Sequence, residues 1–492
     1  MSLDLISRPD RFFIGGDWVA PSTGSRIDVI NPSTEEVFVS VAEAQAVDME
    51  RAIAAAREAF DRGPWRKMSH AERGGYVRAL GKAIEQRAED FARIWTSQIG
   101  VTLEIARGSI ALPVYAFEQN AQIAETFPFE ERHEPKWSEG VGLLVREPVG
   151  VVGAIIPWNA PLVMIGYKLA PALVAGCTVV VKSSPEAPGE ALLVAEIAAG
   201  LGFPPGVINV VTADREVSEM LVRDPRVDKI SFTGSSLAGK RIASLCGERI
   251  ARFTLELGGK SAGILLDDYD VENVAETLGI QATALSGQVC CSITRLICTR
   301  KRHDDLVGAL AARFKQIRVG DPFASNTDMG PLAMRRQRER VEELIAAGKA
   351  EGATLATGGA RPAALNRGFY IEPTVFGNVA NSSTIAQQEI FGPVISVIPA
   401  DSEDQAIDIA NDTVYGLNNT VYTNDPDRAY RFARELRSGT VGQNSDRSDA
   451  TIAFGGFKQS GIGREGGVEG LHEFLETKTI VLDSAPSHLR SA

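Results

Sequence analysis

The chain has 492 residues, of which 44% are hydrophobic and 23% charged, so we expect a globular protein of two or three domains. Its formal net charge of −12 argues against a nucleic-acid-binding protein, because such proteins normally carry a basic face. The first residues lack the basic and apolar regions of a signal peptide. No apolar run reaches the ~18 uninterrupted residues of a membrane span, so neither a nucleic-acid nor a membrane partner is expected.

The cysteines do not form a recognisable disulfide or metal-binding pattern. Their number is odd and their positions are scattered, which favours a reducing, cytoplasmic location. None has the paired spacing of a zinc site, so no metal is expected. Cys177, Cys246 and Cys298 are expected to be small buried side chains, whereas Cys290 and Cys291 lie in a different setting.

Residues 151–232 have the most regular pattern in the chain. Short apolar runs at 151–156, 178–181, 207–211 and 229–232 are typical of buried parallel strands. Helical patterns lie between them, among them 162–174, closed by Gly176, and 189–199, just after Pro188. This alternation predicts an α/β fold with a doubly wound parallel sheet. Ligands of such sheets bind beyond the carboxyl ends of the strands.

One of these strand ends is rich in glycine and serine. The strand leads into Gly234-Ser235-Ser236-Leu237-Ala238-Gly239, where backbone N–H groups can approach a pyrophosphate at a helix N-terminus. The spacing is neither the GxGxxG fingerprint nor a P-loop. On its own, this segment is more typical of a plain glycine turn.

Two later segments carry side chains suited to covalent catalysis. Cys290 lies in Gly287-Gln288-Val289-Cys290-Cys291, and Glu256 begins Glu256-Leu257-Gly258-Gly259-Lys260. A thiol in a small, polar turn can act as a nucleophile, and a carboxylate can activate the water that later releases the product. An ordinary thiol has a pKa of roughly 8.5, so we expect N–H donors or a base to favour the thiolate of Cys290.

Taken together, the motifs resemble those of the aldehyde dehydrogenase superfamily. The resemblance runs from Phe13-Ile14-Gly15-Gly16 to Lys478, and so many motifs in one order make it highly specific. In chain order the motifs are Pro157-Trp158-Asn159, Lys182, Gly234, Glu256, Cys290, Glu389-Ile390-Phe391-Gly392-Pro393, Tyr415-Gly416-Leu417, Phe454-Gly455-Gly456-Phe457-Lys458 and Ser460-Gly461-Ile462-Gly463-Arg464-Glu465.

The resemblance implies NAD(P)-dependent oxidation of an aldehyde followed by hydrolysis. Cys290 would attack the aldehyde carbon to form a thiohemiacetal, and the Asn159 amide with the Cys290 N–H would stabilise the oxyanion. Hydride transfer to the nicotinamide leaves a thioester, and Glu256 would activate the water that hydrolyses it. Lys168 and Asn444 match positions with a supporting role. Considered singly, Asn159 is more typical of a turn and Glu256 of a solvated carboxylate.

The resemblance also implies a cofactor site. Lys182 and Glu389 would hold the two riboses, Gly234 and Ser235 would approach the pyrophosphate, and Phe391 would flank the nicotinamide. Where many NAD-dependent relatives carry a ribose-binding glutamate, this chain has Pro185, with Glu186 one position later. The expected cofactor is NAD, with NADP as the alternative. The complete set is Ile156, Pro157, Trp158, Lys182, Gly234, Ser235, Leu257, Glu389 and Phe391.

The expected substrate side is apolar and lacks two bulky side chains. Ala160 and Ala284 occupy positions where aromatic residues are common in relatives. Small residues in an apolar lining predict a widened tunnel and a bulky apolar aldehyde, whether aromatic, terpenoid or medium-chain. Arg447 is more typical of a solvated loop than of a receptor for a carboxylate-bearing aldehyde. The expected pocket residues are Ala160, Met164, Tyr167, Ala284, Val289, Cys291 and Phe454.

By the same resemblance, the chain would divide into three parts. Residues 1–128 and 149–258 would form a discontinuous dinucleotide-binding domain, and residues 259–460 a second α/β domain that contains the catalytic cysteine. Residues 129–148 and 474–492 would form a small β arm. Exposed strands of such an arm need a covering subunit, so we expect a homodimer or homotetramer.

Three other functions fit part of this pattern. An acylating dehydrogenase would pass the thioester to coenzyme A, but such relatives typically lack the base that Glu256 provides. A thioesterase or esterase could use Cys290 and water without a redox step. A binding or structural protein could keep the fold and lose the chemistry, although intact Cys290, Glu256 and Asn159 argue against it.

Overall fold

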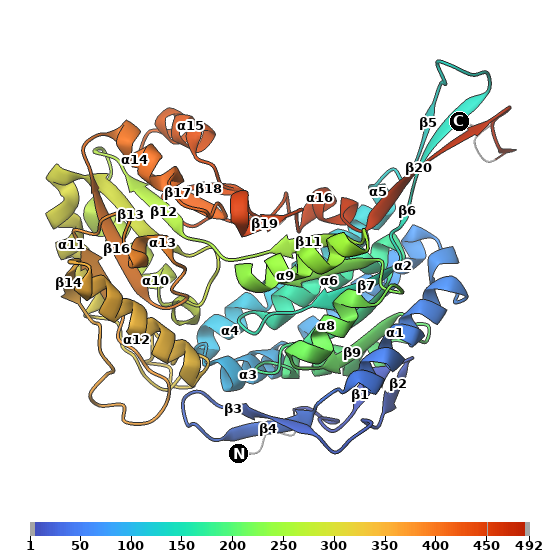
Figure 1. The fold of residues 1–492 in the computed structure, drawn as a ribbon, viewed down its shortest axis with the longest axis horizontal. Coiled ribbons are helices and arrows are strands. Elements are labelled where there is room, and N and C mark those ends of the chain that lie inside the picture. The colour runs from blue at the N-terminus through green and yellow to red at the C-terminus, as the bar shows by residue number, and fades with distance from the viewer. Residues whose placement is uncertain (1–4, 450, 488–492) are drawn as a thin grey trace.

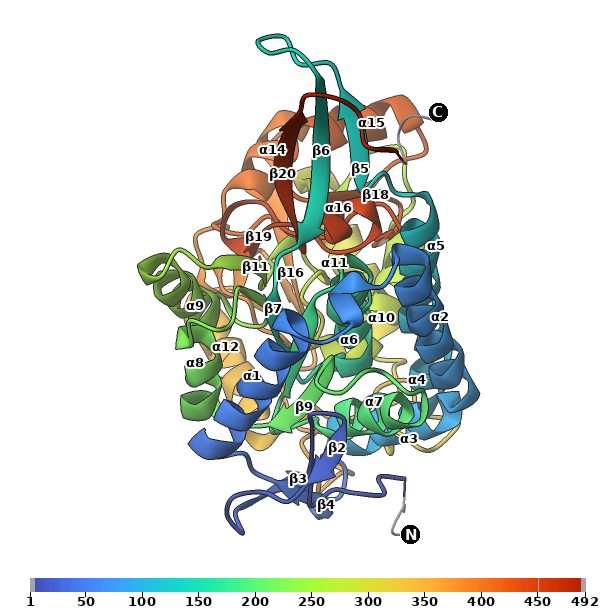
Figure 2. The same ribbon diagram turned by 90° about the vertical axis from the view of Figure 1, so that its right-hand side faces the viewer.

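The computed structural model describes residues 5–449 and 451–487. Two large β-sheets lie side by side, each between layers of helices, and a three-stranded ribbon projects from one end (Figures 1 and 2). Residues 1–4 and 488–492, the outer ends of the expected first domain and arm, lie outside the described residues. Within the described part, every helix is too short or too polar to cross a membrane.

The larger sheet has eight strands, and the five in its centre are parallel. In spatial order the strands are β19 (Gly461–Ile462), β11 (Arg252–Glu256), β10 (Lys229–Thr233), β7 (Val151–Ile155), β8 (Thr178–Ser183), β9 (Ile208–Thr212), β1 (Phe12–Ile14) and β2 (Asp17–Val19). Strands β19 and β1 pair antiparallel with β11 and β9. The chain runs outward from β7 through β8 to β9 and then returns to the other side of β7, so the carboxyl end of β7 lies at a topological switch point.

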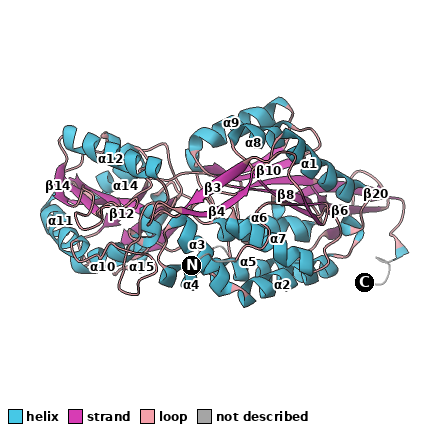
Figure 3. Cartoon of the chain, turned by 90° about the horizontal axis from the view of Figure 1, so that it is seen from below, coloured by secondary structure: helices cyan, strands magenta, loops and turns pink. Residues whose placement is uncertain are grey.

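Helices cover both faces of this sheet (Figure 3). One face carries α1 (Ala46–Asp61), α8 (Arg215–Arg223) and α9 (Ser236–Glu248), and the other carries α2 (His70–Gln86), α5 (Ala111–Thr126), α6 (Pro161–Ala175) and α7 (Gly189–Gly200). Two further helices, α3 (Ala88–Ile99) and α4 (Leu103–Ser109), lie beside the second group. The doubly wound sheet is therefore confirmed, and its predicted strands and helices lie within two residues of the observed bounds.

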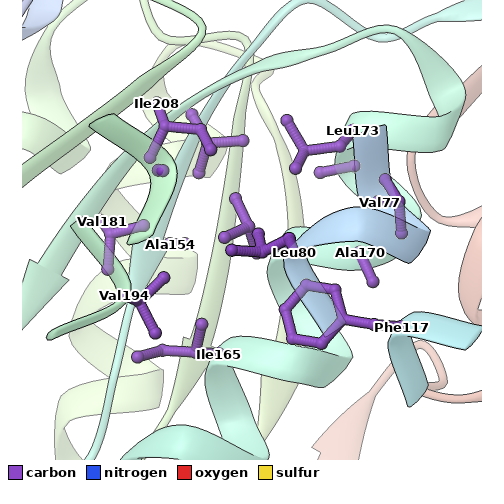
Figure 4. Packing of buried hydrophobic residues seen from close by; sticks show 14 of the residues in the cluster. Val77, Leu80, Phe117, Ala154, Ile165, Ala170, Leu173, Val181, Val194 and Ile208 are labelled. Atoms are coloured by element: carbon purple, nitrogen blue, oxygen red, sulfur yellow. The ribbon is translucent and has the colours of Figure 1, made fainter. Parts of the chain in front are cut away.

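Close packing fixes α6 against the sheet (Figure 4). This helix is mostly apolar, and all of its residues except Val163, Met164 and Tyr167 are buried. Gly176 ends it in a left-handed conformation, with φ at 102°. The core residues around it include Val77, Leu80, Phe117, Ala154, Ile165, Leu173, Val181, Val194 and Ile208. The N-terminus of α6 is thereby held at the switch point.

The second large sheet has seven strands, all parallel to their neighbours except at one edge. In order they are β14 (Thr354–Thr357), β15 (Thr374–Gly377), β16 (Val394–Ala400), β13 (Ile293–Thr299), β12 (Ser261–Leu265), β17 (Asn418–Tyr422) and β18 (Thr440–Gln443). Its helices are α10 (Val271–Gln281), α11 (Arg300–Phe314), α12 (Arg335–Ala350), α13 (Thr384–Gln387), α14 (Glu403–Asn411) and α15 (Pro426–Glu435).

The projecting ribbon consists of strands from the two segments expected to form the β arm. Strand β6 (Val141–Pro148) pairs antiparallel with both β5 (Glu130–His133) and β20 (Leu475–Leu482), so the ribbon joins two segments that are far apart in the chain. A short helix, α16 (Gly467–His472), precedes β20, and β3 (Arg26–Ile30) pairs with β4 (Val37–Ala42) near the N-terminus.

Candidate active site

The catalytic motifs meet at the junction between the two large sheets. Glu256 ends β11, and Gly259 follows it in the connection to β12. A Cβ on Gly259 would lie 2.4 Å from the carbonyl oxygen of Cys290, so only glycine admits the cysteine loop here. Gly287, with φ at +75°, makes a similar approach, since its Cβ would lie 2.4 Å from the carbonyl carbon of Gly392. Three motifs that are distant in the sequence therefore pack directly on one another.

The loop before Cys290 has an unusual backbone. Leu285, Ser286 and Gly287 all have left-handed φ angles, of 49°, 55° and 75°, although non-glycine residues rarely adopt this conformation. The Ser286 hydroxyl holds the turn by donating to the carbonyl oxygens of Gly330 at 2.9 Å and Pro331 at 3.0 Å. The loop is thus fixed by contacts outside itself.

Asn159 is linked to this loop by its side chain. The residue stands just before α6 and is half-buried. Its Nδ2 donates a hydrogen bond to the carbonyl oxygen of Gln288 at 3.0 Å. An amide nitrogen carries two hydrogens, so the second can be donated to a ligand. The structure therefore bonds the predicted oxyanion residue to Gln288, which stands two residues before Cys290 in the chain.

The Cys290 thiol does not have the environment that the sequence led us to expect. A hydrogen bond to Cys291 and burial raise the pKa of Cys290 well above its ordinary value, and the charges of Glu256 and Glu389 raise it further. The expected preference for thiolate is therefore wrong for the free protein. The physical reason is that the hydrogen bond with Cys291 and burial, more than the nearby carboxylates, disfavour the charged form of the sulfur.

Glu256 is buried at the end of β11, with 2% of its surface exposed. Within the described part of the chain, its Oε1 has no hydrogen-bond partner. Burial, and next the nearby Glu465 carboxylate, raise the pKa of Glu256 well above its ordinary value. The alternative of a solvated carboxylate is therefore excluded. An unpaired carboxyl oxygen beside the nucleophile is suited to bind and activate a water.

Lys168 and Glu465 form a buried ion pair next to Glu256. Lys168 Nζ contacts Glu465 Oε1 and also lies 3.4 Å from Ser231 Oγ. Both charged side chains are almost completely buried. Glu465 is held by reciprocal backbone hydrogen bonds with Phe454, of 2.6 and 2.7 Å. The pair compensates two charges that could not otherwise be buried.

We expect Lys168→Met to lower the free energy of unfolding by about 3–5 kcal/mol, because Glu465 would be left buried without a counterion. Urea unfolding followed by circular dichroism measures this loss. The matched control is Arg431→Met, which breaks the exposed pair with Glu435 and should cost less than about 1 kcal/mol. Equal effects of the two substitutions would contradict the assigned role of the buried pair.

The expected cofactor residues border the carboxyl ends of the parallel strands. Pro157 and Trp158 follow β7, Lys182 lies in β8, and Gly234 leads from β10 into α9. The first turn of α9 presents backbone N–H groups, and Ser235 caps it by accepting from Ala238 N–H at 3.3 Å. Such a helix N-terminus suits the negative charge of a pyrophosphate.

The second sheet contributes further residues that face these strand ends. The Phe391 ring meets the Trp158 ring edge-on at 5.3 Å. Glu389 Oε1 accepts from Gly259 N–H at 3.2 Å, and burial raises the pKa of Glu389 to about 7. Burial lowers the pKa of Lys182 to about 8. Apolar rings, a carboxylate, a lysine and a helix N-terminus together match the rings, sugars and phosphates of a dinucleotide, so the residues fit NAD(P).

The expected substrate residues are mostly half-buried, as suits a lining that can meet a ligand. This holds for Ala160, Met164, Tyr167, Ala284, Val289 and Cys291, while Phe454 is 8% exposed. Ala160 borders a small hollow that is also lined by Ile110, Pro113 and Val163. Arg447 is exposed and bonds to Ser445 Oγ at 3.0 Å, as expected of a solvated loop residue.

The remaining cysteines are free thiols, like Cys290 and Cys291. Cys177, Cys246 and Cys298 are buried as predicted. In residues 5–449 and 451–487, no cluster of three or more histidine, cysteine, aspartate or glutamate side chains is arranged to hold a metal ion.

Sequence reasoning missed several residues that touch the site. Asp446 accepts from Cys291 Sγ at 3.8 Å and from the Asn418 amide. Burial raises the pKa of Asp446 to about 6. Trp95 Nε1 donates to the Asn159 carbonyl oxygen at 2.9 Å. No local pattern could have revealed these contacts, because their partners lie 28 to 155 positions away in the chain.

Comparison with known proteins decides the family. A family model described as "Aldehyde dehydrogenase family" matches residues 18–480. The chain belongs to the aldehyde dehydrogenase family. It is therefore an NAD(P)-dependent enzyme that oxidises aldehydes, as the sequence predicts.

Individual relatives of this aldehyde dehydrogenase span almost its whole length. It is 42% identical to the geranial dehydrogenase of Castellaniella defragrans, over 96% of this chain and 98% of the relative. A crystal structure of a Mycobacterium tuberculosis aldehyde dehydrogenase with NAD+ has a TM-score of 0.94 and 41% identity, and the match covers 96% of this chain and 98% of that one. A mutant aldehyde dehydrogenase C from Pseudomonas syringae, crystallised with NAD+ and octanal, has a TM-score of 0.93 and 40% identity. The match covers 96% of this chain and 97% of that one.

Proposed function

We propose that this aldehyde dehydrogenase oxidises a bulky apolar aldehyde to its carboxylic acid with NAD+ and water, through a covalent intermediate on Cys290. The observation that carries the proposal is the meeting of Cys290, Asn159 and Glu256 where the two large sheets join. A thiol, an amide N–H and a buried carboxyl are the groups that such a reaction requires.

In the first half of the reaction, the Cys290 sulfur forms a bond to the aldehyde carbon. The thiol proton passes to the ionised fraction of Glu256, and the carbonyl oxygen becomes an oxyanion. Asn159 donates its second N–H to this oxyanion, while the first N–H remains on the Gln288 carbonyl. Bound NAD+ supplies the chemistry of a hydride acceptor.

In the second half, water attacks the thioester carbon. Glu256, which has released the thiol proton to solvent, takes a proton from the water and returns it to the Cys290 sulfur as the C–S bond breaks, and the acid leaves. The raised pKa of Glu256 suits this task, because a carboxylate with a higher pKa is a stronger base at the pH where it is ionised.

The proposed cofactor contacts are residues at the carboxyl ends of the parallel strands and on the facing side of the second sheet. Lys182 and Glu389 would bind the riboses, the N-terminus of α9 at Gly234 and Ser235 the pyrophosphate, and Phe391 the nicotinamide ring. The remaining contacts would come from Ile156, Pro157, Trp158 and Leu257.

The charges near Lys182 favour NAD over NADP. The carboxylates of Glu186 and Asp214 both act on the Lys182 ammonium. Glu186 is itself held by the Ser184 hydroxyl and by Arg336 of α12. Negative charge at this place would repel a 2′-phosphate, even though Pro185 supplies no acceptor. In the comparisons, the M. tuberculosis and P. syringae structures are complexes with NAD+.

The substrate class follows from small side chains in an apolar lining. Ala160 and Ala284 are small side chains at positions expected to line the substrate site, where each occupies less space than an aromatic ring would. A wide apolar site loses less by admitting a bulky chain than a narrow one. The names of two relatives, one acting on geranial and one crystallised with octanal, support this class.

We also propose that the two large sheets and the three-stranded ribbon mark the three domains predicted from the sequence, with residues 259–460 as the catalytic domain. The ribbon of β5, β6 and β20 would be covered by another subunit in a homodimer or homotetramer, because exposed strand edges invite pairing. The five unpaired thiols support a cytoplasmic location.

Steady-state kinetics across aldehydes with NAD+ and NADP+, followed by NAD(P)H absorbance, test this function. We expect higher kcat/KM with NAD+ and with terpenoid or medium-chain aldehydes than with acetaldehyde. Ala160→Phe should lower kcat/KM for geranial by about 10- to 200-fold and leave acetaldehyde nearly unchanged. An equal change for both aldehydes would refute the proposed role of Ala160, and no cofactor reduction with any aldehyde would refute the oxidation itself.

A further inference from the structure

A buried tryptophan holds the backbone of the oxyanion residue. Trp95 lies in α3 and is 4% exposed. Its indole Nε1 donates a hydrogen bond of 2.9 Å to the carbonyl oxygen of Asn159. Trp65, the other deeply buried tryptophan of this part of the molecule, has no partner for its Nε1 among the described residues. The indole N–H of Trp95 is therefore specifically aimed at the site.

Helix α3 is itself anchored one turn further on. Gln98 lies on the same face as Trp95, three positions later, and is 1% exposed. Its Nε2 donates to Glu190 Oε2 at 3.2 Å, and its Oε1 accepts from Gly189 N–H at 3.0 Å. Both acceptor and donor belong to the first turn of α7. The helix that bears Trp95 therefore cannot shift without breaking two buried hydrogen bonds.

On its other side, Asn159 is bonded to the nucleophile loop. Its Nδ2 contacts the carbonyl oxygen of Gln288, and Gln288 Oε1 in turn accepts from Ala333 N–H at 3.0 Å. A continuous chain of hydrogen bonds thus runs from α3 through Asn159 and the loop of Cys290 to Ala333, on the side of the second sheet.

The local sequence around Asn159 does not supply this anchoring. Ala160 occupies the N-cap position of α6, and its side chain can make no capping hydrogen bond. The segment before α6 would therefore be free to fray at its entry if nothing outside the helix held it. Glu190 of α7 accepts from the Leu162 N–H in the first turn of α6, and Trp95 bonds the carbonyl oxygen of Asn159 just before that turn.

From these contacts we infer that Trp95 is a positioning residue, which fixes the backbone of Asn159 so that one amide N–H stays on Gln288 and the other points at the oxyanion. This inference rests on the proposed function, in which Asn159 stabilises that oxyanion. Oxyanion donors act only when they are held in place before the reaction, since a small displacement weakens the bond to the transition state.

The test is Trp95→Phe, which keeps an aromatic ring and removes the N–H. We expect kcat/KM to fall about tenfold, the equivalent of one hydrogen bond, while the dissociation constant for NAD+, measured by calorimetry, stays unchanged. Trp65→Phe is the matched control, because it makes the same change at a buried indole whose N–H has no hydrogen-bond partner in the described part of the chain. Gln98→Met is a second variant that loosens α3 with Trp95 intact, and it should lower kcat/KM in the same direction.

A double-mutant cycle separates positioning from general damage. If Trp95 acts through Asn159, Trp95→Phe should change kcat/KM less than twofold in the Asn159→Ala background. The same tenfold loss in both backgrounds, or equal losses in Trp95→Phe and Trp65→Phe, would overturn the inference. An Asn159→Ala variant with unchanged kcat/KM would instead overturn the oxyanion role in the proposed function, and the positioning role with it.

Discussion

Cys290→Ala is expected to lower kcat/KM for aldehyde oxidation by at least about 10⁴-fold, because the group that forms the covalent bond is lost. No neighbouring thiol can take its place. The adjacent Cys291 donates its hydrogen to Asp446, and the other three cysteines are buried. NAD(P)H absorbance with a saturating aldehyde measures the loss.

Binding of NAD+ should survive this substitution, since the residues proposed to bind the cofactor lie on other segments. Calorimetry with NAD+ therefore distinguishes a lost nucleophile from a damaged fold. The control is Cys246→Ala, which removes a buried thiol from α9 at a distance from the site and should retain most of the activity. If Cys290→Ala kept a tenth of the wild-type rate, covalent catalysis by this residue would have to be abandoned.

Much of the cofactor half could be predicted from residues 151–232 alone. The strands there are short apolar runs, the first of which stops at Pro157, and the helices between them have clear boundaries. Such segments depend on local patterning, so the sequence states them directly. The positions of Cys290, Glu256 and Asn159 were predicted for a different reason, namely the order of the family motifs along the chain.

Contacts between distant segments were not predictable in the same way. Trp95 bonds a carbonyl 64 positions away, and Lys168 pairs with Glu465, 297 positions away. A pattern in one segment does not specify its partner in another, because tertiary packing decides which side chains meet. Lys168 was assigned a supporting role without a partner, and the structure supplies that partner.

The pKa of Cys290 differs most clearly from what the sequence led us to expect. From the motif alone, a catalytic thiol suggests a lowered pKa. In the structure, Cys291 and two carboxyl groups surround Cys290 and raise its pKa. Glu256 has a raised pKa as well. The free protein thus favours the protonated Cys290 thiol, and the reaction requires a base that takes its proton.

This arrangement leads to the prediction for Glu256→Gln. The substitution keeps the shape of the side chain and removes the base, so hydrolysis of the thioester should slow by about 10²- to 10⁴-fold. One equivalent of NADH per active site should still form in a burst that is slower than in the wild type, because the Cys290 thiol must then lose its proton to hydroxide, and turnover nearly stops after it. Rapid mixing with absorbance detection measures the burst, and mass spectrometry of the quenched protein should show the acyl group on Cys290.

The pH dependence gives this prediction a sign. Because the pKa of Glu256 is raised, its ionised, basic form gains population as the pH increases through that pKa, and wild-type turnover should rise with it. In Glu256→Gln this limb should disappear from the steady-state rate. The burst should instead accelerate with pH, since the Cys290 thiol then loses its proton directly to hydroxide. Glu272→Gln, an exposed residue of α10, is the matched control and should retain the wild-type profile. Full steady-state turnover of Glu256→Gln without an acyl intermediate would show that another group activates the water.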